Sequence, residues 1–129
     1  MKVTVRRPQS RVSIVVPEGR IDAVSGPKLR VLLRNQAKQG TPFLIIDLRQ
    51  VTFMDSSGLS ALVSALKAVR PLKGAVYLVG PTPQVRMALR MTMMDQIFPI
   101  YETVEDALAA LSTHPTSTTT AAEERGMSS

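Results

Sequence analysis

The sequence predicts an α/β domain with a mixed sheet that contains parallel crossovers. Strand-length apolar runs stand at residues 12–16, 43–48 and 75–79. Segments with apolar residues at helical spacing separate and follow these runs. Alternation of strands with helices is typical of sheets whose parallel strands are joined by crossover helices. The run at 43–48 is apolar at almost every position, as expected for a strand covered by helices on both faces.

The first predicted elements are strands followed by a helix. Residues 2–5 form a possible strand, and the VSIVV run at 12–16 forms a second one. The PEG sequence at 17–19 is expected to end that strand, because Pro and Gly favour turns. The SGP sequence at 25–27 predicts a helix start with Pro in the first turn. Gly and Pro within residues 39–42 predict the end of this helix, whose apolar face comprises Leu29, Leu32, Leu33 and Ala37.

The central part of the chain contains the most informative segment. Residues 49–54 are expected to connect the strand at 43–48 to the DSSG sequence at 55–58. A helix follows and is expected to end at Pro71. The apolar stripe of this helix comprises Leu59, Leu62, Val63, Leu66 and Val69.

The last predicted elements complete a single domain over residues 1–111. Thr82-Pro83 predicts the start of a helix after the strand at 75–79. The run at 97–101 predicts a short strand, and its Pro99 predicts an edge position because Pro cannot donate to a ladder. A capping-box pattern begins at Thr103 and predicts a final helix through Leu111. Residues 112–129 are small and polar, and we expect a disordered tail.

Composition excludes several classes of function. The chain has no Cys and a single His, His114, so thiol chemistry, an imidazole triad and a Cys- or His-based metal site are not expected. No phosphate-binding Gly-rich loop is present. No apolar run is long enough to span a bilayer. We therefore expect a cytoplasmic binding protein, not an enzyme, with no metal, cofactor or membrane contact.

The net charge of +6 leaves the class of partner open. A basic domain suits nucleic acid, an anionic membrane or an acidic protein, or simply has a solvated basic surface. The Arg and Lys residues are scattered singly, without the interleaved aromatic residues common in nucleic-acid interfaces. This pattern favours a solvated surface or an acidic protein partner over direct binding to nucleic acid.

The DSSG segment at 55–58 has two interpretations. Asp and Ser are common capping residues, so the segment can be simply a helix start. The unpaired N–H groups and dipole at a helix start also favour a phosphate on a serine there. Phosphorylation would add about −1.5 to −2 charges and change the surface without requiring the fold to change.

The sequence VTFMDSSGLSALVSALK resembles the signature of the STAS family, which includes the anti-sigma factor antagonists. The resemblance extends over about residues 10–111. It includes the EGRIDA stretch at 18–23, FLIIDL before the signature, and the pattern from PTPQVRMALR to VEDALAAL. The family fold is a mixed sheet of four to five strands packed against about four helices, which agrees with the α/β prediction.

The resemblance also implies a function and a set of site residues. An anti-sigma factor with serine kinase activity would phosphorylate Ser57, and a PP2C-type phosphatase would reset this switch. The unphosphorylated protein would bind the anti-sigma factor and release a sigma factor. The partner-binding residues would be Asp22, Met54, Asp55, Ser56, Ser57, Gly58 and Leu59.

Several of these residues have purely structural alternatives. Asp22 could serve only in a turn, Met54 could fill the core, and Gly58 could permit close packing at the helix start. An alternative function is a STAS subunit that does not switch, in a stress-signalling or lipid-transport complex.

Overall fold

The computed structural model describes residues 1–113, which form six strands and four α-helices. The strands are β1 (Lys2–Gln9), β2 (Val12–Ile21), β3 (Phe43–Asp47), β4 (Val51–Met54), β5 (Ala75–Val79) and β6 (Ile100–Tyr101). The helices are α1 (Ser25–Lys38), α2 (Ser56–Val69), α3 (Pro83–Met91) and α4 (Val104–Leu111). Short 3₁₀ turns follow α2 at Arg70–Leu72 and α3 at Met94–Gln96.

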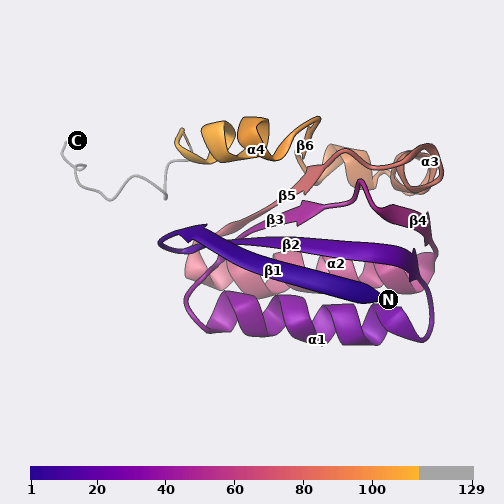
Figure 1. Cartoon of the computed structure of the whole chain (residues 1–129), viewed down its shortest axis with the longest axis horizontal. Helices are drawn as coiled ribbons and strands as arrows, with labels where there is room; N and C mark the ends of the chain where they lie inside the picture. The colour runs from indigo at the N-terminus through magenta and orange to yellow at the C-terminus, as the bar shows by residue number, and fades with distance from the viewer. Residues whose placement is uncertain (114–129) are drawn as a thin grey trace.

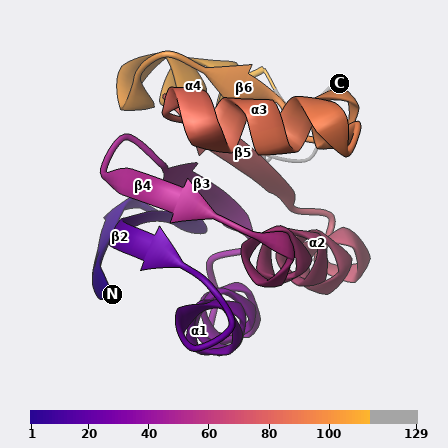
Figure 2. The ribbon, with the colours of Figure 1, turned by 90° about the vertical axis from the view of Figure 1, so that its right-hand side faces the viewer.

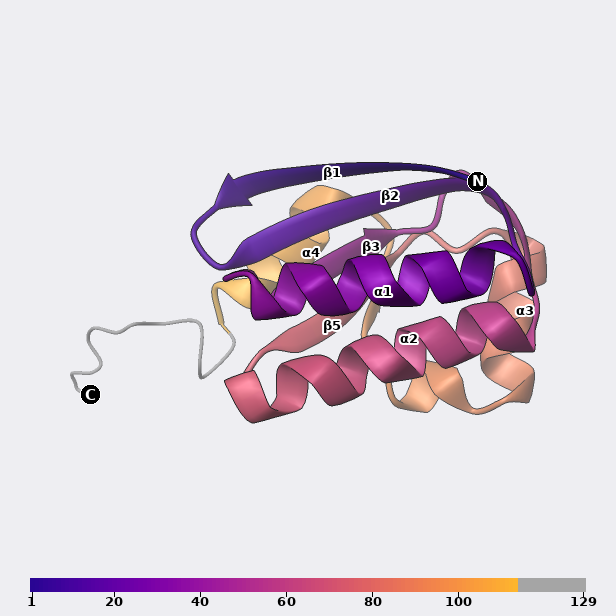
Figure 3. The same ribbon diagram turned by 90° about the horizontal axis from the view of Figure 1, so that it is seen from below.

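The strands form one mixed sheet in the order β1-β2-β3-β5-β6, with β4 paired to β2. The β1–β2 pair is antiparallel, and the other pairs are parallel. Helices α1 and α2 lie side by side below the sheet, and α4 lies above it (Figure 1, Figure 3). Helix α3 lies next to β4 (Figure 2). The predicted α/β class with a mixed sheet is confirmed, and the sheet has six strands where four to five were predicted.

Strand β2 continues through the PEG sequence at 17–19, so the predicted break there is wrong. Pairing with β3 ends at Val15, and pairing with β4 begins at Gly19. Pro17 therefore lies where β2 changes neighbours, and its missing N–H costs no ladder bond on that side. Gly19 has a φ of 91° at a register shift and donates its N–H to the Gln50 carbonyl at 2.9 Å. This positive φ suits glycine.

The segment 49–54, predicted as a connector, contains strand β4. An ion pair between a buried carboxylate and an exposed arginine lies at the turn that precedes it. Asp47 is 4% exposed and accepts from Arg49 Nε at 2.9 Å and from its terminal nitrogen at 2.7 Å. The Asp47 carboxylate also raises the pKa of the Arg49 guanidinium, by hydrogen bonding first and by charge second. The chain then runs along the far half of β2, where Val51, Phe53 and Met54 pair with it as a parallel strand.

The core lies on both faces of the sheet. Leu44 and Ile46 of β3 pack in the cluster that includes α1 and α2, whereas Phe43 and Ile45 pack in the cluster that includes α4. All four side chains are at most 1% exposed. The prediction that residues 43–48 are covered on both faces is thus confirmed for the strand that forms there.

The remaining elements begin and end close to the positions predicted from the sequence. Helix α1 begins at Ser25, and Gly40 beyond its end has a φ of 112°. Strand β6 lies at the sheet edge, as Pro99 predicted, although it is only two residues long. Thr103 accepts from the Asp106 N–H at 3.0 Å and begins α4 as predicted. The tail prediction for 112–129 falls on residues that, from 114 onward, lie outside the described residues.

Candidate functional site

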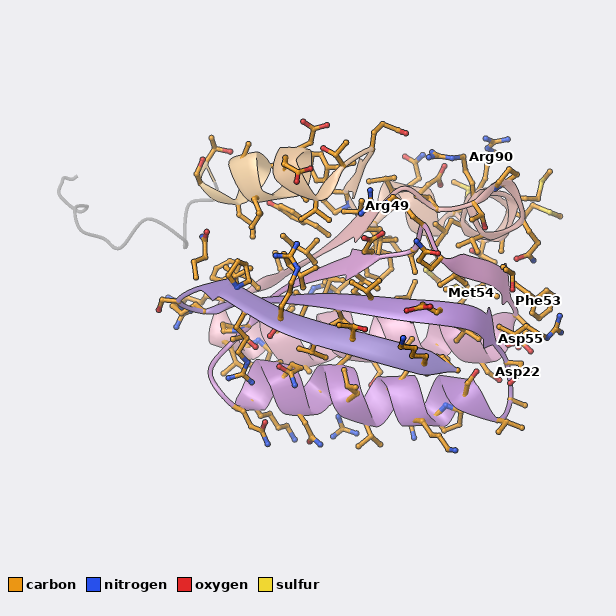
Figure 4. All side chains as sticks on the ribbon, in the orientation of Figure 1. Asp22, Arg49, Phe53, Met54, Asp55 and Arg90 are labelled. Atoms are coloured by element: carbon orange, nitrogen blue, oxygen red, sulfur yellow. The ribbon has the colours of Figure 1, made fainter. Side chains whose placement is uncertain are left out.

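The candidate site lies where two neighbouring parallel strands end. The last residues of β2 and β4, Ile21 and Met54, are partners in the ladder. The next residue after β4, Asp55, donates its N–H to the Ile21 carbonyl at 3.3 Å. Asp22 and Asp55 therefore emerge at the same end of the sheet, as Figure 4 shows. Two residues that are distant in sequence are brought together by strand pairing.

Each aspartate organises the helix that follows its strand. Asp55 Oδ1 accepts from the Ser57 N–H at 2.8 Å and caps α2. Asp22 Oδ1 accepts from the Val24 and Ser25 N–H groups at 3.0 and 3.2 Å, just before α1. Both carboxylates thus satisfy backbone donors that have no partner within the helix. The contacts support a structural role for both aspartates at the helix starts. Both residues are half-buried, so part of each carboxylate also faces solvent.

Asp22 gives a pH-dependent prediction. Backbone hydrogen bonds from Ser25 and then Val24 hold the pKa of the Asp22 carboxyl below its usual value of 3.8. A lowered pKa means that the turn gains stability from the ionised carboxylate, and loses it only as pH falls through the folded-state value. In an NMR titration, the Val24 and Ser25 amide shifts should therefore move below pH 3.8. Asp22→Asn should abolish this movement, and an unchanged inflection in that variant would assign it to another acid.

The two serines of the DSSG segment differ in exposure. Ser56, the first residue of α2, is exposed, whereas Ser57 is half-buried. Ser57 packs against the start of α1: a Cβ added to Gly26 would lie 2.9 Å from both the Ser57 Cβ and the Ser57 carbonyl oxygen. Gly26 is thus the close-approach position between α1 and α2. The structure therefore presents the Ser56 hydroxyl more openly than the Ser57 hydroxyl.

Three predicted partner-binding residues lie in the core. Met54 is 1% exposed, Leu59 is 9% exposed, and Gly58 is buried. A Cβ at Gly58 would lie 2.5 Å from Met54 Cγ and 3.0 Å from Ile21 Cγ2, so the glycine permits the helix start to rest on the strand ends. These residues support the site from below. Of the other residues in the predicted set, Ser56 is exposed, and Asp22, Asp55 and Ser57 are half-buried.

Helix α3 contributes two contacts that the sequence analysis did not predict. Gln84 Oε1 accepts from the Met54 N–H at 2.9 Å, and Gln84 Nε2 donates to the Met54 carbonyl at 3.2 Å. Thr82, expected to cap α3, instead donates its hydroxyl to the Val51 carbonyl at 2.8 Å. The start of α3 therefore pairs with the free edge of β4, as another strand would. No local signal marks these contacts, because they join segments about thirty residues apart.

An arginine and an aromatic ring extend the site along β2 and β4. Arg20 and Phe53 are ladder partners, and the Arg20 guanidinium lies 4.1 Å from the centre of the Phe53 ring. Such a cation–π contact stabilises the exposed Arg20 and the half-buried Phe53. Arg20 Nε also lies 3.8 Å from Asp22 Oδ2. Phe53, Arg20 and Asp22 thus place apolar, cationic and anionic groups next to one another; Figure 4 labels Phe53 and Asp22 at this end of the molecule.

A hollow of about 300 Å³ lies between α1 and α2 beside the serines. Its lining residues are Gly26, Pro27, Arg30, Ser56, Ser57 and Ser60. The described residues include no cluster of three or more acidic or histidine side chains able to hold a metal ion. Within residues 1–113, every helix is too short or too polar to cross a bilayer.

Fold and site together define a class of small α/β domain that presents a capped, serine-bearing helix start at the carboxyl ends of paired strands. The chain belongs to the STAS domain family, whose model matches residues 4–107. The family predicted from the DSSG signature and its flanking segments is thus confirmed.

The similar proteins include several antagonists. The anti-sigma-B factor antagonist of Listeria monocytogenes is 35% identical over 83 residues, covering 64% of this chain and 72% of the relative. An anti-sigma factor antagonist structure from Mycobacterium paratuberculosis is 32% identical with a TM-score of 0.75, covering 84% of this chain and 92% of its own. The antagonist SpoIIAA in its unphosphorylated form shares the fold, with 19% identity, a TM-score of 0.78 and coverage of 86% and 96%.

Proposed function

We propose that this chain is an anti-sigma factor antagonist switched by phosphorylation at the start of α2. Unmodified, it binds an anti-sigma factor that has serine kinase activity, and the bound sigma factor is released. The kinase then phosphorylates the site and ends the association, and a PP2C-type phosphatase restores it. The chain acts in the cytoplasm as a binding protein, without a cofactor and without direct contact with nucleic acid or membrane.

The observation that carries the proposal is the surface formed by exposed Ser56 with half-buried Asp22, Asp55 and Ser57. Both carboxylates accept hydrogen bonds from backbone N–H groups, which hold this surface in place, and buried residues support it from below. A rigid surface of this kind binds with little ordering cost. It also carries serine hydroxyls where a phosphate would alter the contact directly. The antagonists among the similar proteins support the class of partner, and SpoIIAA, by its description, has a phosphorylated form.

We take Ser57 as the acceptor, because it is the second serine of the DSSG segment, the position that the resemblance to the STAS family implies. Phosphoryl transfer requires the attacking oxygen to reach the γ-phosphate nearly in line. Ser57 is half-buried against Gly26 of α1, and it lines the hollow between α1 and α2. The neighbouring Ser56 is exposed and is therefore the competing acceptor that an experiment must distinguish from Ser57.

Single replacements of the two serines test this assignment. Incubated with ATP and the cognate anti-sigma kinase, wild type should gain one phosphate by intact-mass measurement. Ser57→Ala should gain none, and Ser56→Ala should still gain one, because the Ser57 hydroxyl remains. Both variants should melt within a few degrees of wild type, since surface substitutions usually change stability by less than about 0.5 kcal/mol. The reverse pattern would make Ser56 the acceptor, and phosphate on both variants would place the modification outside this pair.

A specific surface favours the alternative function, a STAS subunit that does not switch. Four large apolar side chains are 48–76% exposed on and after α3, namely Met87, Met91, Met93 and Ile97. Exposed apolar patches mark interaction sites, and Met-rich ones adapt to varied partners. A subunit of a lasting stress-signalling or lipid-transport complex would use such a patch and leave Ser57 unmodified. Chain purified from cells that contain the kinase would then carry no phosphate by intact mass.

A further inference from the structure

Helices α1 and α2 carry positive charge only. Neither helix contains an Asp or a Glu. Their basic residues are all exposed, namely Lys28, Arg30, Arg34, Lys38 and Lys67. Cations in the last turn of a helix offset its dipole, which accounts for Lys38 and Lys67. Arg30 and Arg34 lie before the last turn of α1, so the dipole does not explain them.

Two hollows follow one another along the seam where α1 and α2 lie side by side (Figure 3). The first contains Ser57 and Arg30 among its lining residues. The second has a volume of about 280 Å³ and lies one to two helical turns further along both helices. Its lining residues are Arg34, Lys38, Ser64, Lys67 and Ala68. We call the two hollows together the basic groove, because four cations and no carboxylate line them.

The four cations of the basic groove have no partner within residues 1–113. The ion pairs of this part of the chain use Arg20, Arg49 and Arg86. In the same range, no hydrogen bond or ring contact engages the side chains that carry the groove's charge, Arg30, Arg34, Lys38 and Lys67. A carboxylate of another molecule can therefore pair with them without displacing an existing partner.

We propose that the basic groove docks an acidic segment of the anti-sigma factor. This inference rests on the proposed binding of an anti-sigma factor at the start of α2. The groove begins in the hollow that contains Ser57, so it is continuous with the proposed contact surface. Complementary charge across an interface fixes the register of the partners and speeds their association. A phosphate on Ser57 places a dianion at the end of the groove, where like charge opposes the acidic segment.

The lining of the basic groove favours an acidic protein over nucleic acid or a membrane. Neither α1 nor α2 contains an aromatic residue, so these helices offer no ring on which a base could stack. The uncharged residues of both hollows are Gly, Ala, Pro and Ser. None of them is a bulky apolar side chain of the kind that enters lipid from an interfacial helix.

A double charge reversal, Arg34→Glu with Lys67→Glu, tests the groove away from the phosphorylation site. Both residues line the second hollow, so the surroundings of Ser57 are unchanged. The matched control is Arg6→Glu with Arg90→Glu, at exposed positions of β1 and α3. The two double variants have equal net charge, so a difference between them reports where the charges lie. Arg34→Gln with Lys67→Gln removes the same charges without introducing a carboxylate, and all variants are checked by thermal melting.

Calorimetric titration of the full, unmodified chain with the anti-sigma factor at low salt measures the effect. The Glu variant of the groove should bind about 10- to 100-fold more weakly than wild type, because attraction is replaced by repulsion. The Gln variant should lose about 3- to 10-fold, and the control should stay within about twofold. Added salt should weaken wild type more steeply than the Gln variant, since screening acts on the charges that the variant lacks.

Equal affinities of wild type and the Gln variant would overturn the inference, and so would an equal loss in the groove and control variants. A random-sequence DNA duplex and vesicles of phosphatidylglycerol with phosphatidylcholine are the other probes. Groove-dependent binding of either, with the anti-sigma factor unaffected, would assign the groove to that ligand instead. The proposed switch is read separately, from chain carrying phosphoserine at position 57. If that phosphate leaves the affinity unchanged, the switch fails, while the variants still decide whether the groove binds the anti-sigma factor.

Discussion

A phosphate on Ser57 should weaken binding of the anti-sigma factor by about 30- to 5,000-fold while leaving the fold intact. At a contact surface, the dianion must lose water and also meets the like charge of the nearby Asp55. Mismatched charge at a buried contact costs about 2–5 kcal/mol, which corresponds to that loss of affinity. In the first turn of α2, by contrast, the helix dipole stabilises the phosphate by about 0.3–1 kcal/mol. The cost at the interface therefore exceeds the local effect on the domain.

Calorimetry checks both halves of this prediction. Titration against the anti-sigma factor gives the affinity, and thermal melting gives the stability of each form. Ser57→Asp is a weaker mimic, because it supplies one charge and fewer acceptor oxygens, so its affinity should fall between those of the unmodified and phosphorylated proteins. A large drop in melting temperature on phosphorylation would instead mean that the switch works by unfolding. Ser57→Ala should bind like wild type, since it adds no charge.

Met54→Ala should destabilise the domain by about 2–5 kcal/mol. The side chain is 1% exposed and packs beneath Gly58, between the end of β4 and the start of α2. Its truncation leaves a cavity that the rigid strand ends cannot close, and buried Met→Ala changes cost about this much. The backbone contacts of Met54 with Gln84 do not involve the lost atoms. Urea unfolding followed by circular dichroism measures the change in free energy.

Met91→Ala is the matched control for this substitution. Met91 is 76% exposed at the end of α3, so the same chemical change should alter the free energy of unfolding by less than about 0.5 kcal/mol. Equal losses of stability in the two variants would contradict the burial of Met54. A stable Met54→Ala protein with weakened partner binding would favour the other interpretation of this residue, as a direct partner contact.

Elements with local signals were predictable from the sequence. Helix α2 has an aspartate cap and an apolar stripe, and β3 is apolar on both faces, so neither depends on distant residues for recognition. Strand β4 and the second half of β2 were missed for one shared reason. Each is short or interrupted by Pro and Gly, and each becomes a strand by pairing with the other. Tertiary pairing here overrides the local preference for a turn.

The site residues also divide into those with a local sequence signal and those recognised only in the folded chain. Asp22, Asp55 and the serines were expected together, through a resemblance to the STAS family and their places at strand and helix ends. Residues that act across elements were not found: Gln84 at the edge of β4, Gly26 against Ser57, and Arg30 beside the serines. Their residue types are ordinary, and only the folded chain shows what they face. The relative exposure of Ser56 and Ser57 likewise depends on α1, which no local pattern reveals.

Release of a sigma factor is the most direct measurement of the central claim. A preformed complex of the cognate anti-sigma factor with its sigma factor is mixed with unmodified chain or with chain carrying phosphoserine at position 57, and free sigma factor is measured by size-exclusion chromatography. The account predicts that the unmodified chain releases the sigma factor and that the phosphorylated chain, at the same concentration, does not. Equal release by both forms, or release by neither, would contradict it.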